Sequence, residues 1–323
     1  MNVCGKNHCR TPPALFRGSL SFLGSNRTLF LFRPYLYDNG TGFFKRGNQR
    51  VIELGVIGAA IAAFLIWRMV RRRRRQALAD REFPQKWVAI LEQNMPIYRA
   101  LPEALREDLH GHIHLFLHDK SFEGFHGLEV TEEMRLTVAG HACLLLINRD
   151  NACYSNFSSV YLYPSTFVST QTTRDGVVER VGQQARLGES WHRGPIVLAW
   201  DSVLHGARDT KDGHNVVLHE FAHKLDDADG RVDGAPLLQQ RSHYVTWARV
   251  MSREFKQLQK RADRRAKAVM DHYGATNPAE FFAVLTETFY EKPRQLKKKH
   301  PELYAAMQDC FQVDPLAWQQ EKP

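Results

Sequence analysis

The chain has 323 residues, 43% of them hydrophobic, and a formal net charge of +9. This composition supplies a folded core of one large or two small domains, so it excludes a disordered or fibrous protein. The first 75 residues contain 14 Lys and Arg against Asp38 and Glu53, whereas the rest contains 30 Lys and Arg against 33 Asp and Glu. Because the positive charge is confined to the N-terminal segment, it gives no support to direct nucleic-acid binding by the folded part.

The five cysteines are irregularly spaced and odd in number in a chain far longer than a disulfide-stapled module. This usage indicates a reducing compartment rather than a disulfide framework.

Residues 1–50 mix Pro, Gly, Asn and scattered Arg without clean periodicity, and we interpret them as poorly structured or as an over-extended start of the reading frame. Residues 51–75 have the pattern of a membrane anchor. Their uninterrupted apolar core, Leu54–Trp67, is 14 residues long. With Met69 and Val70 counted, the span reaches 17 residues, or about 26 Å of helix, which is barely enough to cross a bilayer.

The flanking charges predict the orientation of this anchor. Lys45, Arg46 and Arg50 precede the apolar segment, whereas Arg68 and Arg71–Arg75 follow it. Since the more positive flank stays in the cytoplasm, we expect a single-pass protein of the bacterial inner membrane with its bulk in the cytoplasm. The alternative is a soluble cytoplasmic protein.

Residues 80–323 are expected to form one α+β domain, mainly helical with a small mixed sheet. Helical periodicity covers residues 83–98, 105–117 and 137–148, strand-like runs cover 154–168 and 193–200, and the chain after Asp201 is mainly helical. Gly194 and Pro195 at the start of the second strand favour a sheet edge, along which an extended peptide could pair, over a core strand.

Four histidines, His110, His112, His114 and His118, lie within the second predicted helix. Three of them would share one helical face, but no carboxylate pattern accompanies them. We interpret them as part of a solvated amphipathic face.

The motif H-E-x-x-H occurs at His219, Glu220 and His223 inside a helix-compatible apolar run. A spacing of four residues places both imidazoles on one side of a helix, where they can bind one metal ion. A carboxylate beside such an ion can act as the general base that accepts the proton of the attacking water. The motif therefore predicts a single-zinc peptidase site with Glu220 as its base.

A catalytic zinc site needs a third protein ligand. Asn277 and Pro278 are typical of a helix start, which makes Glu280 either that ligand or the carboxylate half of a capping box. Glu287 lies on the same helical face, and Asp229 is the ligand in a metzincin-like interpretation. The residues alone leave these three alternatives open, with Glu280 favoured.

Several segments together resemble the Mlc titration factor A family of zinc metallopeptidases. The resemblance is carried by Gly206–Gly230, Tyr273–Pro293, Gly188–Asp201 and Tyr161–Val168, and it covers about residues 83–315. It is more specific than the five-letter motif, and the segment before Phe83 departs from the short soluble form of that family.

The resemblance implies a zincin-like fold with one zinc ion bound by His219, His223 and Glu280, and with Glu220 as base. It also implies that the Tyr273 hydroxyl stabilises the developing oxyanion. The expected activity is aminopeptidase-like cleavage of peptides. The alternative function is a zincin-fold binding protein that sequesters a sugar-responsive transcriptional repressor of the Mlc type.

Overall fold

The structure is a computed structural model that describes residues 41–149, 154–165 and 194–318. The first helix, α1 (Thr41–Ala79), includes the predicted anchor and begins ten residues before it. Residues Leu54–Ala79 are long and apolar enough to cross a membrane, with an 18-residue window of mean hydropathy 1.7 and no buried side chains in it. The apolar side chains from Leu54 to Val70 are all exposed. Residues 1–40 of the predicted extension lie outside the described residues.

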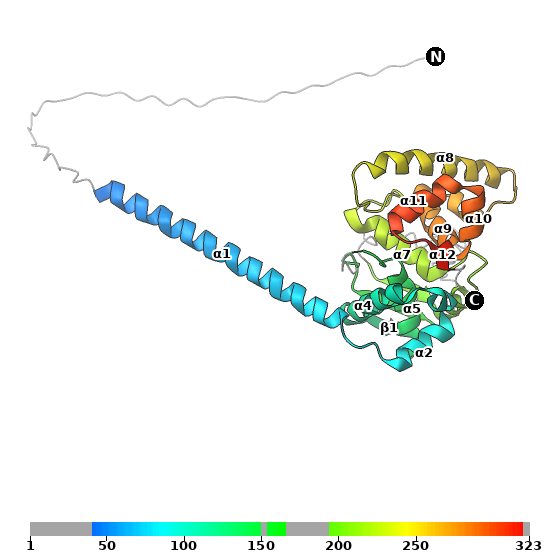
Figure 1. The fold of residues 1–323 in the computed structure, drawn as a ribbon, viewed down its shortest axis with the longest axis horizontal. Coiled ribbons are helices and arrows are strands. Elements are labelled where there is room, and N and C mark those ends of the chain that lie inside the picture. Colours follow the sequence, from blue (N-terminus) through cyan, green and yellow to red (C-terminus); the bar gives the residue numbers. More distant parts are fainter. Residues whose placement is uncertain (1–40, 150–153, 166–193, 319–323) are drawn as a thin grey trace, which may run out of the picture. The chain divides into compact units, whose positions relative to one another are not determined.

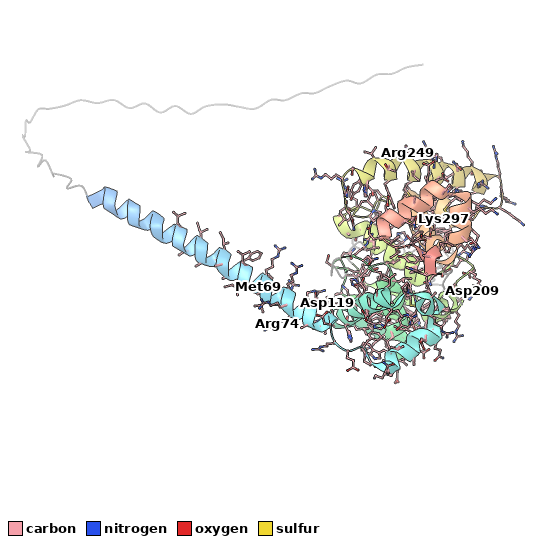
Figure 2. The ribbon with its side chains drawn as sticks, in the orientation of Figure 1. Met69, Arg74, Asp119, Asp209, Arg249 and Lys297 are labelled. Carbon is pink, nitrogen blue, oxygen red and sulfur yellow. The ribbon has the colours of Figure 1, made fainter. Side chains whose placement is uncertain are left out.

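The described residues from Leu65 to Trp318 form one compact unit. The end of α1 packs within this unit on α4 (Glu103–Asp119), and Figure 2 labels Asp119 beside it. Arg75 donates to the Asp119 carboxylate at 2.7 Å. A Cβ on Gly111 would lie 3.4 Å from the Ala79 side chain, so this glycine allows the two helices to approach closely.

The remaining helices follow the expected order of helix, strand and then mainly helix (Figure 1). They are α2 (Gln85–Asn94), α3 (Pro96–Ala100), α5 (Glu132–Leu144), α6 (Trp200–Arg208), α7 (Val216–Asp226), α8 (His243–Asp263), α9 (Pro278–Glu291), α10 (Pro293–Lys299), α11 (Pro301–Phe311) and α12 (Pro315–Trp318), with short 3-10 turns η2 (Asp227–Asp229) and η3 (His272–Ala275). The domain is therefore mainly helical, as predicted.

The described residues form a sheet of three strands in the order β1 (Ser121–Gly124), β2 (Ser159–Tyr163) and β3 (Ile196–Ala199). Both pairs of described strands are parallel, with Val160 opposite Phe122 and Ile196, so the mixed sheet expected from the sequence is not what these strands form. The reason is the connection from β1 to β2, which passes through α5 and so can return the chain in the same direction.

β3 ends the strand order among the described residues, as expected for an edge strand. Two parts of the predicted strand runs lie outside the described residues. They are residues 166–168 of the run 154–168 and residue 193 of the run 193–200.

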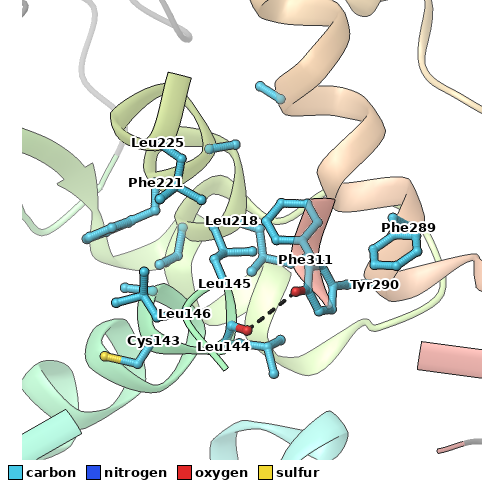
Figure 3. Close-up of a cluster of buried hydrophobic side chains, with 14 of the residues drawn as sticks. Cys143, Leu144, Leu145, Leu146, Leu218, Phe221, Leu225, Phe289, Tyr290 and Phe311 are labelled. Carbon is cyan, nitrogen blue, oxygen red and sulfur yellow. Dashed lines mark hydrogen bonds between the residues drawn. The ribbon is translucent and has the colours of Figure 1, made fainter. Parts of the chain in front are cut away.

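The core joins helices that are distant in the sequence. Leu218, Phe221 and Leu225 of α7 belong to one buried cluster that also includes Leu144 at the end of α5 and Phe289 of α9 (Figure 3). The Tyr290 hydroxyl donates to the carbonyl oxygen of Leu144 at 3.4 Å. This packing holds α7 against α9, and both helices carry predicted site residues.

The prediction of a solvated histidine face on α4 is wrong for most of its length. His112 and His114 are 2% and 9% exposed, and the His110 ring stacks on Phe83 with centroids 3.7 Å apart. Only His118 of this group is exposed. The residues just before α2 cover this face of α4, a contact that helical periodicity within α4 alone does not indicate.

His141 of α5 provides a test of this buried core. Its Nδ1 donates to the Thr137 carbonyl oxygen at 2.9 Å, and burial lowers its pKa from 6.5 to about 4. The unfolded chain therefore binds a proton that the folded chain excludes between these pKa values, and stability falls as the pH drops through that window. When the pH falls from 7 to 5, the unfolding free energy of the wild type should decrease by about 2 kcal/mol more than that of His141→Leu, which has no imidazole at this position. The measurement is urea denaturation of both proteins at the two pH values. Equal losses in the two proteins would contradict this account.

Candidate metal centre

Helix α7 begins at a well-formed cap. Asn215 is the N-cap, and its side-chain oxygen accepts from the Leu218 amide at 3.1 Å. The apolar side of α7 is buried, which fixes the rotation of the helix and turns His219 and His223 toward α9. Their ring centroids are 4.9 Å apart and their Nε2 atoms 3.3 Å apart. The two imidazoles thus converge on one point, as the four-residue spacing predicts.

Helix α9 brings the third side chain to this point. Asn277 is its N-cap and accepts from the Glu280 amide at 2.9 Å, with Pro278 in the first turn. The Glu280 carboxylate reaches across to α7, where Oε2 lies 3.1 Å from the Nε2 of His219 and 3.4 Å from that of His223. Candidate ligand atoms of the three residues all lie within 4.8 Å of one another.

The alternatives of the sequence analysis separate in the structure. The capping box is half formed, because Asn277 caps the Glu280 amide while the Glu280 carboxylate is directed to the histidines. Asp229 is exposed in η2, where it accepts from the Arg231 amide at 3.0 Å. Glu287 is buried but approaches the opposite side of the His219 ring.

Glu287 contacts His219 in a way that the sequence analysis did not predict. One of its oxygens is 2.7 Å from the Nδ1 of His219, and the other accepts from the Asn215 backbone amide at 2.6 Å. A carboxylate on Nδ1 fixes the ring so that Nε2 is free to bind a metal, and it raises the basicity of that nitrogen. The seven-residue spacing from Glu280 was the only signal for it, since that spacing places both carboxylates on one face of α9.

The charges of the site favour a cation. Burial lowers the pKa of His219, but hydrogen bonds to Glu280 and Glu287 outweigh this effect and raise the pKa to about 10. Burial likewise raises the pKa of Glu280, yet the hydrogen bonds to the two histidines bring it well below its usual range. Two carboxylates thus hold a positive charge on His219. A divalent ion bound by the three side chains would take the place of that proton.

The donor set fits zinc. Two imidazole nitrogens and one carboxylate oxygen are the three protein ligands of a common type of catalytic zinc site, in which water takes the fourth position. His219 and Glu280 are 2% and 6% exposed, whereas His223 is half-buried and lies on the accessible side. A substrate could therefore approach from the His223 side.

Two further predicted residues lie near this centre. Glu220 is half-buried on α7 between the two histidines. The Tyr273 ring, in η3, has its centroid 6.0 Å from that of His219. In addition, Lys224 of α7 donates to the Gly194 carbonyl oxygen at 3.2 Å, which connects the histidine helix to the segment before β3.

Comparisons with known proteins find relatives that cover most of this chain. Residues 67–312 match the model of the family described as glucose-regulated metallo-peptidase M90. The chain is 39% identical to an uncharacterized protein of Synechocystis over 245 residues, which cover 75% of this chain and 89% of the relative. It is 31% identical to Mlc titration factor A of Pectobacterium atrosepticum over 239 residues, 72% of this chain and 88% of the relative. It is 35% identical to Mlc titration factor A of Serratia proteamaculans over 208 residues, 62% and 77% of the two chains.

The Glu287 contact can be tested by substitution. Glu287→Gln should weaken zinc binding about 10- to 100-fold, because glutamine has one acceptor oxygen and an NH2 group that only donates, so it cannot accept from both His219 and the Asn215 amide. The measurement is a competition titration with a chromophoric chelator.

Glu291, one turn further along the same buried face, is the matched control. Burial raises its pKa to about 9, so it is neutral near pH 7 and a glutamine should replace it with little change. Glu291→Gln is expected to bind zinc within about threefold of the wild type. Equal weakening by both substitutions would show a general effect of altering α9.

Proposed function

This chain belongs to the glucose-regulated metallo-peptidase M90 family, and from that premise and the geometry of the site we propose that it is a zinc-dependent peptidase. We assign His219, His223 and Glu280 as the ligands of one zinc ion. The observation that carries the proposal is the convergence of their ligand atoms from two separately capped helices to within 4.8 Å of one another.

In this mechanism the two histidines and Glu280 would hold a zinc ion, and that ion would supply a water molecule whose pKa is lowered from 15.7 toward ~7. Glu220 would accept the proton of this nucleophile as it attacks the peptide carbonyl, and would then donate it to the leaving amine. The Tyr273 hydroxyl donates a hydrogen bond to the oxyanion, an interaction that is stronger in the transition state than in the bound substrate. Glu287 holds His219 in its metal-binding tautomer.

The proposed substrate is a short peptide or an exposed chain terminus, cleaved in an aminopeptidase-like manner. The resemblance to the titration factor family supports this class. We propose that the peptide pairs along β3, whose start is linked to α7 through Lys224 and Gly194.

A second function is favoured by the name of two relatives, Mlc titration factor A. In this alternative the chain binds a repressor of the Mlc type and sequesters it, with or without hydrolysis. The two functions are compatible, because binding of a protein partner and peptide cleavage could use different surfaces.

We further propose that residues 51–75 anchor the protein in the bacterial inner membrane, with a peptidase domain of residues 80–323 in the cytoplasm. The exposed apolar side chains of Leu54–Val70 support the anchor, and Arg71–Arg74 beyond them support the orientation through the positive-inside rule. A soluble cytoplasmic protein remains the alternative location.

Substitution of the base separates the two functions. Glu220→Gln should lower kcat for peptide hydrolysis about 100- to 10,000-fold and leave zinc content at one ion per chain, because Glu220 is not a ligand in this proposal. The measurements are peptide turnover and elemental analysis of the same preparation. Asp229→Ala, which removes an exposed carboxylate just after α7, should change neither.

A protein that acts only by sequestration would keep its repressor binding and show no turnover even as wild type. Retained hydrolysis in Glu220→Gln would contradict the proposed base.

The anchor is tested by extraction of the full-length protein from membranes. An integral helix should withstand high salt and alkaline carbonate, which remove proteins held by the arginines alone, and should be released only by detergent. Release by salt would contradict a membrane-spanning helix.

A further inference from the structure

The loop between η2 and α8 meets three helices at one buried residue, Gly234. Its amide donates to the Asp226 carboxylate, at the end of α7, at 2.9 Å. Its carbonyl oxygen accepts from the Trp247 indole of α8 at 3.0 Å. Its backbone has φ +77°, a conformation that glycine adopts without strain.

The third contact of Gly234 is with the first residue of α9. A Cβ built on Gly234 would lie 2.4 Å from the carbonyl oxygen of Pro278 and 2.9 Å from its carbonyl carbon. These atoms belong to helical backbone and cannot rotate away as a flexible side chain would. The α-carbon of Gly234 therefore packs directly against the turn that carries Glu280, two residues further on.

Asp226 is an unusual residue for its position. A carboxylate at the C-terminal end of a helix is disfavoured by the helix dipole, and this one is only 1% exposed. Its Oδ1 has no hydrogen-bond partner among the described residues. Its Oδ2 accepts from the Gly234 amide, and this bond joins the end of the histidine helix to the loop under α9.

We propose that Asp226, Gly234 and Trp247, together the Gly234 junction, are positioning residues that hold the first turn of α9 at the distance from α7 at which Glu280 can share a metal ion with His219 and His223. This inference rests on the proposed ligand set. The contact of Gly234 with Pro278 acts on the metal through Glu280, because Pro278 and Glu280 share the first turn of α9.

The distances show why this position is sensitive. To accept a methyl group on Gly234, the contact with Pro278 must lengthen from 2.4 Å to about 3.4 Å, where ordinary van der Waals contact begins. A zinc–carboxylate bond is about 2.0–2.2 Å long, so a displacement of about 1 Å at Pro278 moves Glu280 by a large part of a bond length. Weaker coordination by Glu280 follows directly.

The chain contains a matched control for this substitution. Gly230 lies in the same loop with φ +83°, and a Cβ there would have no heavy atom within 4 Å. Alanine at Gly230 or at Gly234 thus introduces the same backbone strain, but only Gly234→Ala displaces Pro278. We expect Gly234→Ala to weaken zinc binding about 10- to 100-fold in the full-length protein, and Gly230→Ala to change it less than about threefold. Equal effects of the two substitutions would overturn the proposal.

A double-mutant cycle tests whether the effect passes through Glu280. In the background of Glu280→Ala, the two histidines remain as a weaker site, and Gly234→Ala should then cost less than about threefold in zinc affinity. A loss as large as in the wild-type background would mean a general structural effect and would overturn the junction. The absorption spectrum of bound Co²⁺ should change in the same way in Gly234→Ala and in Glu280→Ala.

Two gentler variants address the case in which Gly234→Ala fails to fold. Trp247→Phe and Asp226→Ala each remove one hydrogen bond to Gly234 without adding atoms, and each should weaken zinc binding. Asp226→Asn retains an oxygen acceptor for the Gly234 amide and should restore most of the affinity lost in Asp226→Ala. Unchanged affinity in both Trp247→Phe and Asp226→Ala would overturn the proposal.

The same measurements distinguish the junction from the function on which it rests. If Glu280→Ala binds zinc as well as the wild type, the ligand set is wrong and the junction falls with it. If Glu280→Ala loses affinity while Gly234→Ala does not, only the junction is overturned.

Discussion

The contact between α7 and α9 determines the chemistry of this protein, because it buries three ionisable side chains from two helices at one point. His219, Glu280 and Glu287 are nearly inaccessible to water, and two carboxylates against one imidazole leave an excess of negative charge. Burying such a group is costly unless a positive charge balances it. A bound divalent cation would supply that balance. Burial of these carboxylates is therefore costly without a metal ion and favourable with one.

The rest of the domain keeps these helices in place. Each begins at an asparagine that accepts a hydrogen bond from an amide two or three residues into the helix, Asn215 for α7 and Asn277 for α9. Beneath them, aromatic and leucine side chains from α5, α9 and α11 fill the space between the helices. The short parallel sheet contributes Val160, Leu162 and Ile196 to the same core and leaves β3 at the end of the described strands.

Local patterns in the sequence predicted the local parts of this architecture. The convergence of His219 and His223 follows from helical spacing alone, and the start of α9 follows from Asn277 and Pro278. The sequence could not decide among Glu280, Glu287 and Asp229, because that choice depends on how α9 lies against α7. The buried histidines of α4 and the parallel direction of the strands were missed for the same reason, since both depend on contacts between distant segments.

Asn215 connects the start of a helix to the metal centre in a way that affects the lifetime of the protein. Its side chain caps α7, and its backbone amide is bound by the carboxylate that also holds His219. Loss of the metal would leave His219 held by its hydrogen bonds to Glu280 and Glu287 alone, and the stabilisation that the bound ion gives to α7 would be lost. Molecules without metal would therefore open locally at this helix more often, and cellular proteases that attack opened segments would remove them first.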